Sequence, residues 1–233
     1  MWQRTMRLLA AACLISSATY ADVVSATYSE PTTRYAHGVL GDDIEYGTLQ
    51  MTRADGARVT VKLPQDRVFE DLEPRLFDVD QDGDFEVIVI ESSAYEGARL
   101  SVYDQEGLVA ATPFIGRSNR WLAPIGAADL DGDGYIEIAY IDRPHLAKTL
   151  RIWRFKDDKL TQVADKPGLT NHRIGWAFIA GGIRNCDKVP ELITASGDWS
   201  DIIATTFENG RLAFRSIGRY SGPESLDAAV LCN

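Results

Sequence analysis

The sequence predicts an all-β fold made of repeated strand units, and three observations support that prediction. Similar segments recur about every 50 residues. Each segment alternates short runs of β-branched and aromatic residues with tight polar turns such as "DQEG", "KDDK" and "ENGR". No stretch after residue 25 has convincing helical periodicity. Repeats of this length are typical of solenoids, propellers and arrays.

A constant spacing is the clearest sign of the repeat. In three copies an acidic residue opens an apolar strand, and an apolar residue follows the next turn after 21 to 23 residues. The pairs are Glu86 and Leu108, Glu137 and Leu160, and Glu191 and Leu212. A fainter copy, "TLQMTRADGARVTVKL", covers residues 48–63. We therefore expect four repeat units, at residues 25–68, 69–119, 120–170 and 171–225.

Four such units are expected to form a closed ring. An antiparallel four-stranded unit repeated in a row hides its exposed edges best as a ring of blades. The prediction is therefore a small β-propeller with four blades of four-stranded antiparallel sheet. The first unit lacks a strand before His37 that would match "PRLFDVD". Because the C-terminal "LDAAVLCN" resembles "GAADLDG", residues 226–233 are expected to complete the first blade and close the ring.

The N-terminal residues have the character of a secretory signal. Two arginines precede a short apolar core, and small residues allow cleavage before Asp22. We expect residues 1–21 to be a signal peptide and residues 22–233 to form a single domain that is secreted or periplasmic. A lipoprotein signal at Cys13 fits less well, because the preceding apolar run is very short. No segment is long and apolar enough to span a bilayer.

Charge and cysteine content narrow the possible partners and the compartment. The formal net charge of −10 argues against nucleic acid or an anionic membrane surface as a partner. We expect a monomer. Outside the signal segment the chain has two cysteines, Cys186 and Cys232, and in an exported chain these are expected to form a disulfide. Two buried free thiols are the alternative.

Two acidic runs, "DVDQDGDFEV" from residue 78 and "DLDGDGYIEI" from residue 129, predict metal sites. So many carboxylates repel one another unless a cation neutralises them. Carboxylates at positions 1, 3 and 5 line the inside of a tight loop, and Gly83 or Gly134 at position 6 permits the turn. Hard oxygen ligands in a flexible loop suit Ca²⁺ better than Mg²⁺. The loops are not EF-hands, because position 12 holds Val89 or Tyr140 in place of glutamate.

These motifs resemble the FG-GAP/VCBS repeats of integrin-α-type β-propellers, whose calcium loops open a β-hairpin. The resemblance implies that positions 1, 3, 5, 7 (through its backbone carbonyl) and 9 hold the ion. It therefore implies two Ca²⁺ sites. The first set of ligands is Asp78, Asp80, Asp82, Asp84 and Glu86, and the second is Asp129, Asp131, Asp133, Tyr135 and Glu137.

The third copy of the loop, "IRNCDKVPE" at residues 183–191, departs from this pattern. Ile183 stands at position 1 and Lys188 at position 6, where an ammonium group would compete with a metal. We expect this loop to be metal-free and to be tied by the Cys186–Cys232 disulfide, which would join the last full blade to the closing strand.

Binding of a protein or a carbohydrate is the function that the remaining residues favour. The loops opposite the acidic runs are rich in arginines and aromatic residues, which are typical of binding sites. Trp121 and Trp176 stand at equivalent repeat positions and are expected to pack between blades. The candidates for partner binding are Tyr95, Arg120, Arg143, His145, Arg173 and Trp199.

An exported hydrolase or lyase is the alternative, with Asp142 and His145 of "IDRPHLAK" as an acid/base pair. No other catalytic motif is present in the sequence, and the clustered acids are assigned to calcium, so we expect no enzymatic activity. A structural subunit of an envelope complex is a third hypothesis.

Overall fold

The computed structural model describes residues 22–186 and 189–232, so the signal peptide expected at residues 1–21 lies outside the described residues. The described chain is all-β, with antiparallel sheets and one short helix. None of its helices is long and apolar enough to cross a membrane.

The first sheet contains the strands of the first two repeat units. Its order is β1-β2-β4-β6-β7-β8, with β3 on β2 and β5 on β6. The short strand β4 joins the two units, because it pairs with β2 at Tyr46 and Phe69 and also with β6. One sheet per unit was expected, and here that expectation is wrong. The strands are β1 (Val23–Thr32), β2 (Glu45–Arg53), β3 (Arg58–Lys62), β4 (Arg67–Phe69), β5 (Arg75–Phe77), β6 (Glu86–Ser93), β7 (Gly97–Tyr103) and β8 (Leu108–Ala111).

The other two sheets follow the predicted units more closely. The second is a four-stranded antiparallel meander of order β12-β11-β10-β9, and the third has the order β13-β15-β16-β17, with β14 on β15. The strands of the second are β9 (Leu122–Ala128), β10 (Glu137–Asp142), β11 (Thr149–Lys156) and β12 (Lys159–Pro167). Those of the third are β13 (Leu169–Thr170), β14 (Gly182–Arg184), β15 (Glu191–Ser196), β16 (Asp201–Glu208) and β17 (Arg211–Arg219).

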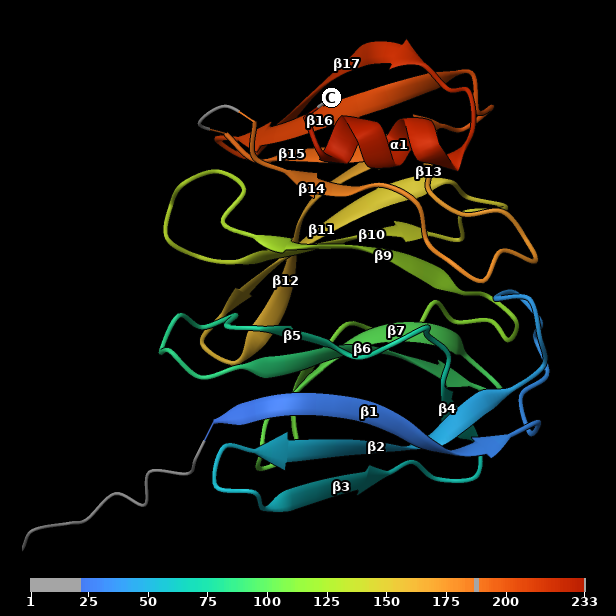
Figure 1. Cartoon of the computed structure of the whole chain (residues 1–233), viewed down its shortest axis with the longest axis vertical. Helices are drawn as coiled ribbons and strands as arrows, with labels where there is room; N and C mark the ends of the chain where they lie inside the picture. Colours follow the sequence, from blue (N-terminus) through green and yellow to red (C-terminus); the bar gives the residue numbers. More distant parts are fainter. Residues whose placement is uncertain (1–21, 187–188, 233) are drawn as a thin grey trace, which may run out of the picture.

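The sheets stack in chain order along the long axis of the molecule, with β1–β3 at one end and β14–β17 at the other (Figure 1). Strands β6 and β10 are buried on both faces, which explains why their sequences are almost continuously apolar. Ile88 and Ile138 belong to the core between the second and third units. Leu150 and Leu192 belong to the core between the third and fourth units. Each sheet therefore holds its neighbour through a shared apolar layer.

The C-terminus differs from the prediction, because α1 (Pro223–Val230) replaces most of the strand expected at residues 226–233. Proline in the first turn has the backbone angle that a helix requires, and Glu224 there complements the helix dipole. Leu226 and Ala229, three residues apart, are buried on one face. The helix contacts β14, β15 and β16 of its own unit.

The strand thought to be missing from the first unit is present as β1, which pairs along its length with β2. Closure of a ring by a C-terminal strand is therefore wrong for the described residues. The first and fourth units meet instead through loops, since the Gly175 N–H donates to the Val39 carbonyl at 3.2 Å. The loop that carries Val39 runs along the side of the stack in Figure 1 (blue, right).

Candidate metal centre and the opposite loop face

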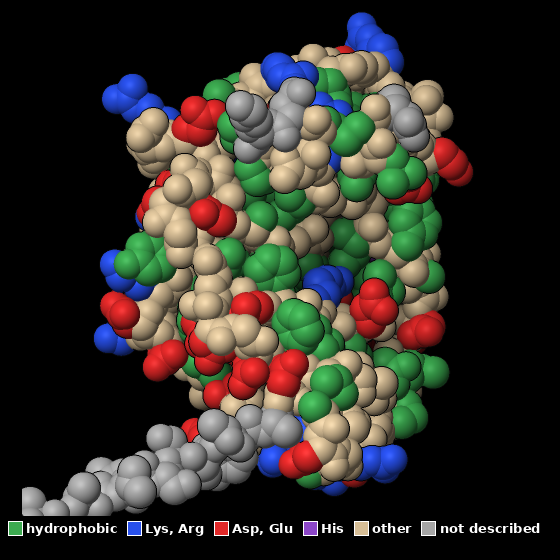
Figure 2. All heavy atoms as spheres, turned by 60° about the vertical axis from the view of Figure 1, so that its left-hand side comes forward, with side chains coloured by type: hydrophobic (Ala, Val, Ile, Leu, Met, Phe, Trp, Pro, Cys, Tyr) green, Lys and Arg blue, Asp and Glu red, His purple; other side chains and the backbone are tan. Residues whose placement is uncertain are grey.

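Both acidic loops lie on the same side of the stack. One connects β5 to β6 and the other connects β9 to β10, on the left of Figure 1. Figure 2 brings this side forward and shows acidic side chains gathered over it. Each loop ends at a strand that enters the core, so the base of the loop is held rigidly while its tip remains exposed.

Hydrogen bonds fold the two loops in the same way. The glutamate at position 9 accepts a hydrogen bond from the backbone N–H at position 2: Glu86 from Val79 at 2.8 Å, and Glu137 from Leu130 at 2.9 Å. The glycine at position 6 donates to the first aspartate, at 3.1 Å from Gly83 to Asp78 and at 3.0 Å from Gly134 to Asp129. Both glycines have positive φ, at 100° and 85°, a conformation that disfavours other residues. The matched bonds place carboxylates at equivalent positions in both loops.

The carboxylates converge as a metal site requires. One oxygen each from Asp78, Asp80 and Glu86 lies within 4.8 Å of the other two, and the same holds for Asp129, Asp131 and Glu137. In each group one buried oxygen has no hydrogen-bond partner: Asp78 Oδ1 and Asp131 Oδ1. Side-chain exposure of Asp131 is only 9%. A buried carboxylate oxygen without a partner is costly, and a hard cation would satisfy it, so these residues fit calcium.

The acid–base properties of the loops agree with this fit. Burial raises the pKa of Glu86 to about 7, although the Val79 N–H opposes the shift. Burial also raises the pKa of Glu137 and of Asp80. The folded protein therefore disfavours the ionised form of these groups, and the pKa of Glu137 is raised although the Arg154 guanidinium opposes the shift.

The remaining predicted ligands lie in the same loops but outside the two close groups. Asp82 accepts from the Asp84 N–H at 2.8 Å, and Asp133 accepts from the Tyr135 N–H at 3.0 Å. These bonds shape the turn at positions 5 to 7. Coordination by Asp82 and Asp133, and by the carbonyls of Asp84 and Tyr135, stays a prediction.

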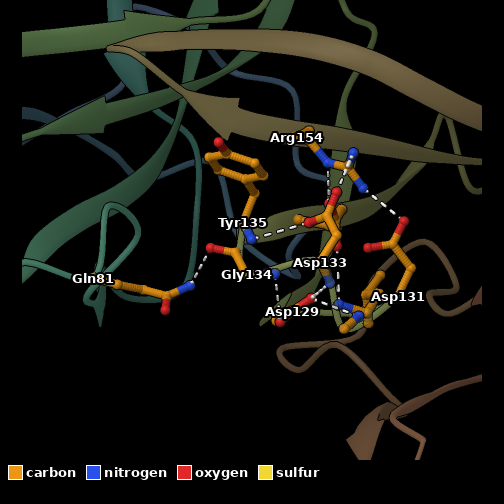
Figure 3. Close-up of polar contacts among 10 residues, drawn as sticks. Gln81, Asp129, Asp131, Asp133, Gly134, Tyr135 and Arg154 are labelled. Atoms are coloured by element: carbon orange, nitrogen blue, oxygen red, sulfur yellow. Dashed lines mark hydrogen bonds and ion pairs between the residues drawn. The ribbon is translucent and has the colours of Figure 1, made fainter.

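Arg154 of β11 distinguishes the second loop from the first (Figure 3). Its guanidinium contacts Glu137 at 2.5 Å, Asp133 at 2.7 Å and Asp131 at 2.8 Å. Cross-strand pairing of Glu137 with Arg154 puts the cation there. The sequence prediction missed Arg154, because only the register of the hairpin brings it to the loop.

The two loops are also joined to each other. The Gln81 side-chain amide donates to the Gly134 carbonyl at 3.0 Å, across 53 residues of sequence (Figure 3). Gln81 lies at the exposed tip of the first loop and has a positive φ of 63°. The sequence alone offers no signal for this contact.

In the third loop, arginines surround the glutamate at position 9. Glu191 contacts Arg184 and Arg215, both at 2.7 Å. The Cys186–Cys232 disulfide is present and confirms the predicted pairing. Cys232 follows α1, so the bridge ties the loop to the end of the helix and not to a closing strand. Lys188 lies outside the described residues.

On the opposite face, loops of different units meet around a pocket of about 200 Å³. Three predicted partner residues line it: Arg120, Arg143 and His145. Asp142 does not pair with His145. Its carboxylate contacts Arg143 at 2.7 Å and Arg151 at 2.9 Å.

The other three partner candidates are spread over the same face. Tyr95 is 74% exposed in the turn between β6 and β7. Arg173 lies over the Trp199 ring at 4.5 Å. Trp199 is half-buried and also contacts Trp176 and Tyr220, so part of its surface is used in packing. Trp121 is buried, and its indole N–H donates to the Glu70 carbonyl at 2.8 Å. This burial confirms its predicted packing role.

Comparison with known proteins bears on the acidic loops. Residues 78–140 match the family model of the FG-GAP-like repeat. The matched segment contains both acidic loops and the strands between them. No curated protein matches the sequence. The match confirms, for residues 78–140, the resemblance drawn from the motifs.

Proposed function

We propose that the protein is an exported, calcium-stabilised interaction module that binds a protein or a carbohydrate through the face opposite its acidic loops. The observation that carries the proposal is the pair of matched loops, each with converging carboxylates and a buried oxygen without a partner. The disulfide agrees with an oxidising compartment.

The role assigned to calcium is structural. The loops end in buried strands, and the carboxylates come from one short loop in each case. An ion held there would bind the folded chain and not the unfolded chain, and so would stabilise the fold. When bound, it would neutralise the clustered carboxylates.

The side chains that contact Asp142 and His145 favour a binding function over hydrolysis. Asp142 is buried between two arginines, and His145 shares a hydrogen bond with His172 at 3.0 Å. Both oxygens of the Asp142 carboxylate accept hydrogen bonds from guanidinium groups, so Asp142 does not orient His145. Arginines and aromatic rings on this face, by contrast, are the side chains that interfaces favour.

Thermal unfolding of residues 22–233 tests the calcium assignment. Free calcium at 100 times its Kd would stabilise the fold by about 2.7 kcal/mol per site. For a domain of this size two such sites would raise the Tm by roughly 10 °C or more over the value in chelator. Asp80→Ala and Asp131→Ala should each remove part of that shift, because each substitution deletes one ligand of one group.

Asp165→Ala is the matched control, since Asp165 is exposed on β12, away from both loops. It should keep the full shift. A Tm that is the same in calcium and in chelator would contradict the proposal.

A further inference from the structure

All three histidines of the chain gather on the loop face, although they come from three repeat units. His145 and His172 share a hydrogen bond at 3.0 Å, and the His172 ring lies 5.0 Å from the Trp121 ring. His37 and His145 both line the pocket of about 200 Å³. The pocket is therefore built by the packing of separate units.

Hydrogen bonds determine which nitrogen of His145 accepts. The Trp176 carbonyl can only accept, so the Nε2–H of His172 donates to it at 2.9 Å. The Nδ1 of His172 is then an acceptor, and the Nε2–H of His145 donates to it. Burial, assisted by His172, lowers the pKa of His145 to about 4, so the ring is neutral at pH 7. Its Nδ1 consequently carries a lone pair that can accept a hydrogen bond.

His37 contacts a buried carboxylate, that of Glu70, which lies outside the pocket lining. Its Nδ1 lies 2.6 Å from Glu70 Oε1, and the second oxygen of Glu70 accepts from the Ser92 hydroxyl. Glu70 is fully buried and does not line the pocket. This arrangement fixes the imidazole while keeping the carboxylate away from a ligand.

The charge of the pocket is opposite to that of the whole chain. Its lining includes Arg120 and Arg143 but no carboxylate. Half-buried Arg120 donates to the Asn119 carbonyl and has no carboxylate partner among the described residues. The single charge of Asp142 is shared by Arg143 and Arg151, which leaves one positive charge in excess. A site with unbalanced arginines, in a chain of net charge −10, attracts anions and disfavours metal cations.

Aliphatic side chains complete the lining. Leu146 and Ile174 are 63% and 71% exposed, although they are large and apolar. Exposed apolar surface beside arginines suits a peptide, whose aliphatic side chain would cover it, better than it suits the hydroxyl groups of a sugar.

We infer that this pocket, formed by His37, Arg120, Arg143, His145, Leu146 and Ile174, binds an acidic peptide. Arg120 and Arg143 hold the ligand carboxylate, and His145 Nδ1 accepts a hydrogen bond from a ligand N–H. Leu146 and Ile174 cover an aliphatic side chain of the ligand. The inference rests on the proposed function and names the ligand class for the same face.

Fluorescence anisotropy with a labelled peptide of alternating leucine and aspartate tests this inference, with a leucine–asparagine peptide as the uncharged probe. The acidic peptide should bind, and added salt should weaken binding. Arg120→Gln and His145→Phe should each raise the Kd tenfold or more. Arg117→Gln, an exposed neighbour outside the pocket lining, should leave the Kd unchanged.

Three results would overturn the inference: no binding of the acidic peptide, equal binding of the asparagine peptide, or equal Kd values for Arg120→Gln and Arg117→Gln. Binding of polygalacturonate in place of the peptide would assign the pocket to an acidic glycan. Unfolding of each preparation in calcium and in chelator separates the two proposals. If calcium raises the Tm but the peptide does not bind, only the assignment of the pocket is rejected. If calcium does not raise the Tm, the proposal of a calcium-stabilised module is itself rejected.

Discussion

Individual residues make the three related loops electrostatically different. In the first loop, every hydrogen bond that a carboxylate accepts from within the loop comes from a backbone N–H. The second loop has one guanidinium, from Arg154, and the third has two, from Arg184 and Arg215. The guanidinium of an arginine neutralises carboxylates as a metal ion would. We therefore expect the first loop, which has no such arginine among the described residues, to bind calcium more tightly than the second.

Replacing Arg154 tests this expectation. Arg154→Met should lower the Tm in chelator, because Glu137 would lose a contact that is charge-assisted. It should also enlarge the rise in Tm on adding calcium, since the ion no longer competes with a guanidinium. Arg211→Met, at an exposed position on β17, should change neither value. A smaller calcium response in Arg154→Met would contradict this account of the second loop.

Glu45 gives a prediction for the dependence of stability on pH. It is 2% exposed, and burial, followed by the charge of Glu70, raises its pKa to about 9. The unfolded chain loses this proton near pH 4.5 and the folded chain near pH 9, so the contribution to stability is full below pH 4.5 and is lost as pH rises to about 9. Glu45→Gln should therefore raise the Tm more at pH 9 than at pH 5.

Differential scanning calorimetry at the two pH values measures this difference. We expect an excess of about 3 °C or more for Glu45→Gln at pH 9. Glu106→Gln, in an exposed turn, is the control and should show no such excess. An equal effect of Glu45→Gln at both pH values would show that the glutamate is ionised in the folded protein.

At the scale of elements, turns and acidic loops could be predicted, but the helix could not. The hairpin of β11 with β12 follows from runs of β-branched and aromatic residues on either side of the "KDDK" turn. Helix α1 has two buried residues, Leu226 and Ala229, in eight positions, which is too short a pattern to recognise as helical. Its packing against β14–β16 selects the helix, and this tertiary contact is not visible in the sequence.

The disulfide is expected to stabilise this C-terminal element. Cys186 and Cys232 are 46 residues apart, and in the chain-entropy model a loop of that length corresponds to about 4 kcal/mol. Replacing both cysteines by serine should lower the Tm by roughly 10 °C. Adding a reductant should lower the Tm of the parent protein by a similar amount and leave the variant unchanged. A double variant as stable as the parent would contradict this role.

At the scale of the whole molecule, the repeat period correctly indicated an all-β chain of antiparallel strands, but not how the sheets are divided among the repeat units. It could not show that β4 links the first two units, because that link depends on a few backbone pairs such as Tyr46 with Phe69. Nor could it show the loop contact between Val39 and Gly175, which joins distant units. The carboxylates of the candidate metal sites are close in sequence and so could be predicted to lie together, whereas Arg154, Gln81 and His37 reach their positions only through tertiary structure.

Counting the calcium ions that each chain binds tests directly whether the acidic loops are calcium sites. Isothermal titration calorimetry of calcium-free residues 22–233 should give two calcium ions per chain, one for each group of carboxylates. Asp80→Ala and Asp131→Ala should each retain one ion, and the double variant should retain none. Binding of no calcium by the parent protein, or of two ions by the double variant, would contradict the assignment of the acidic loops as calcium sites.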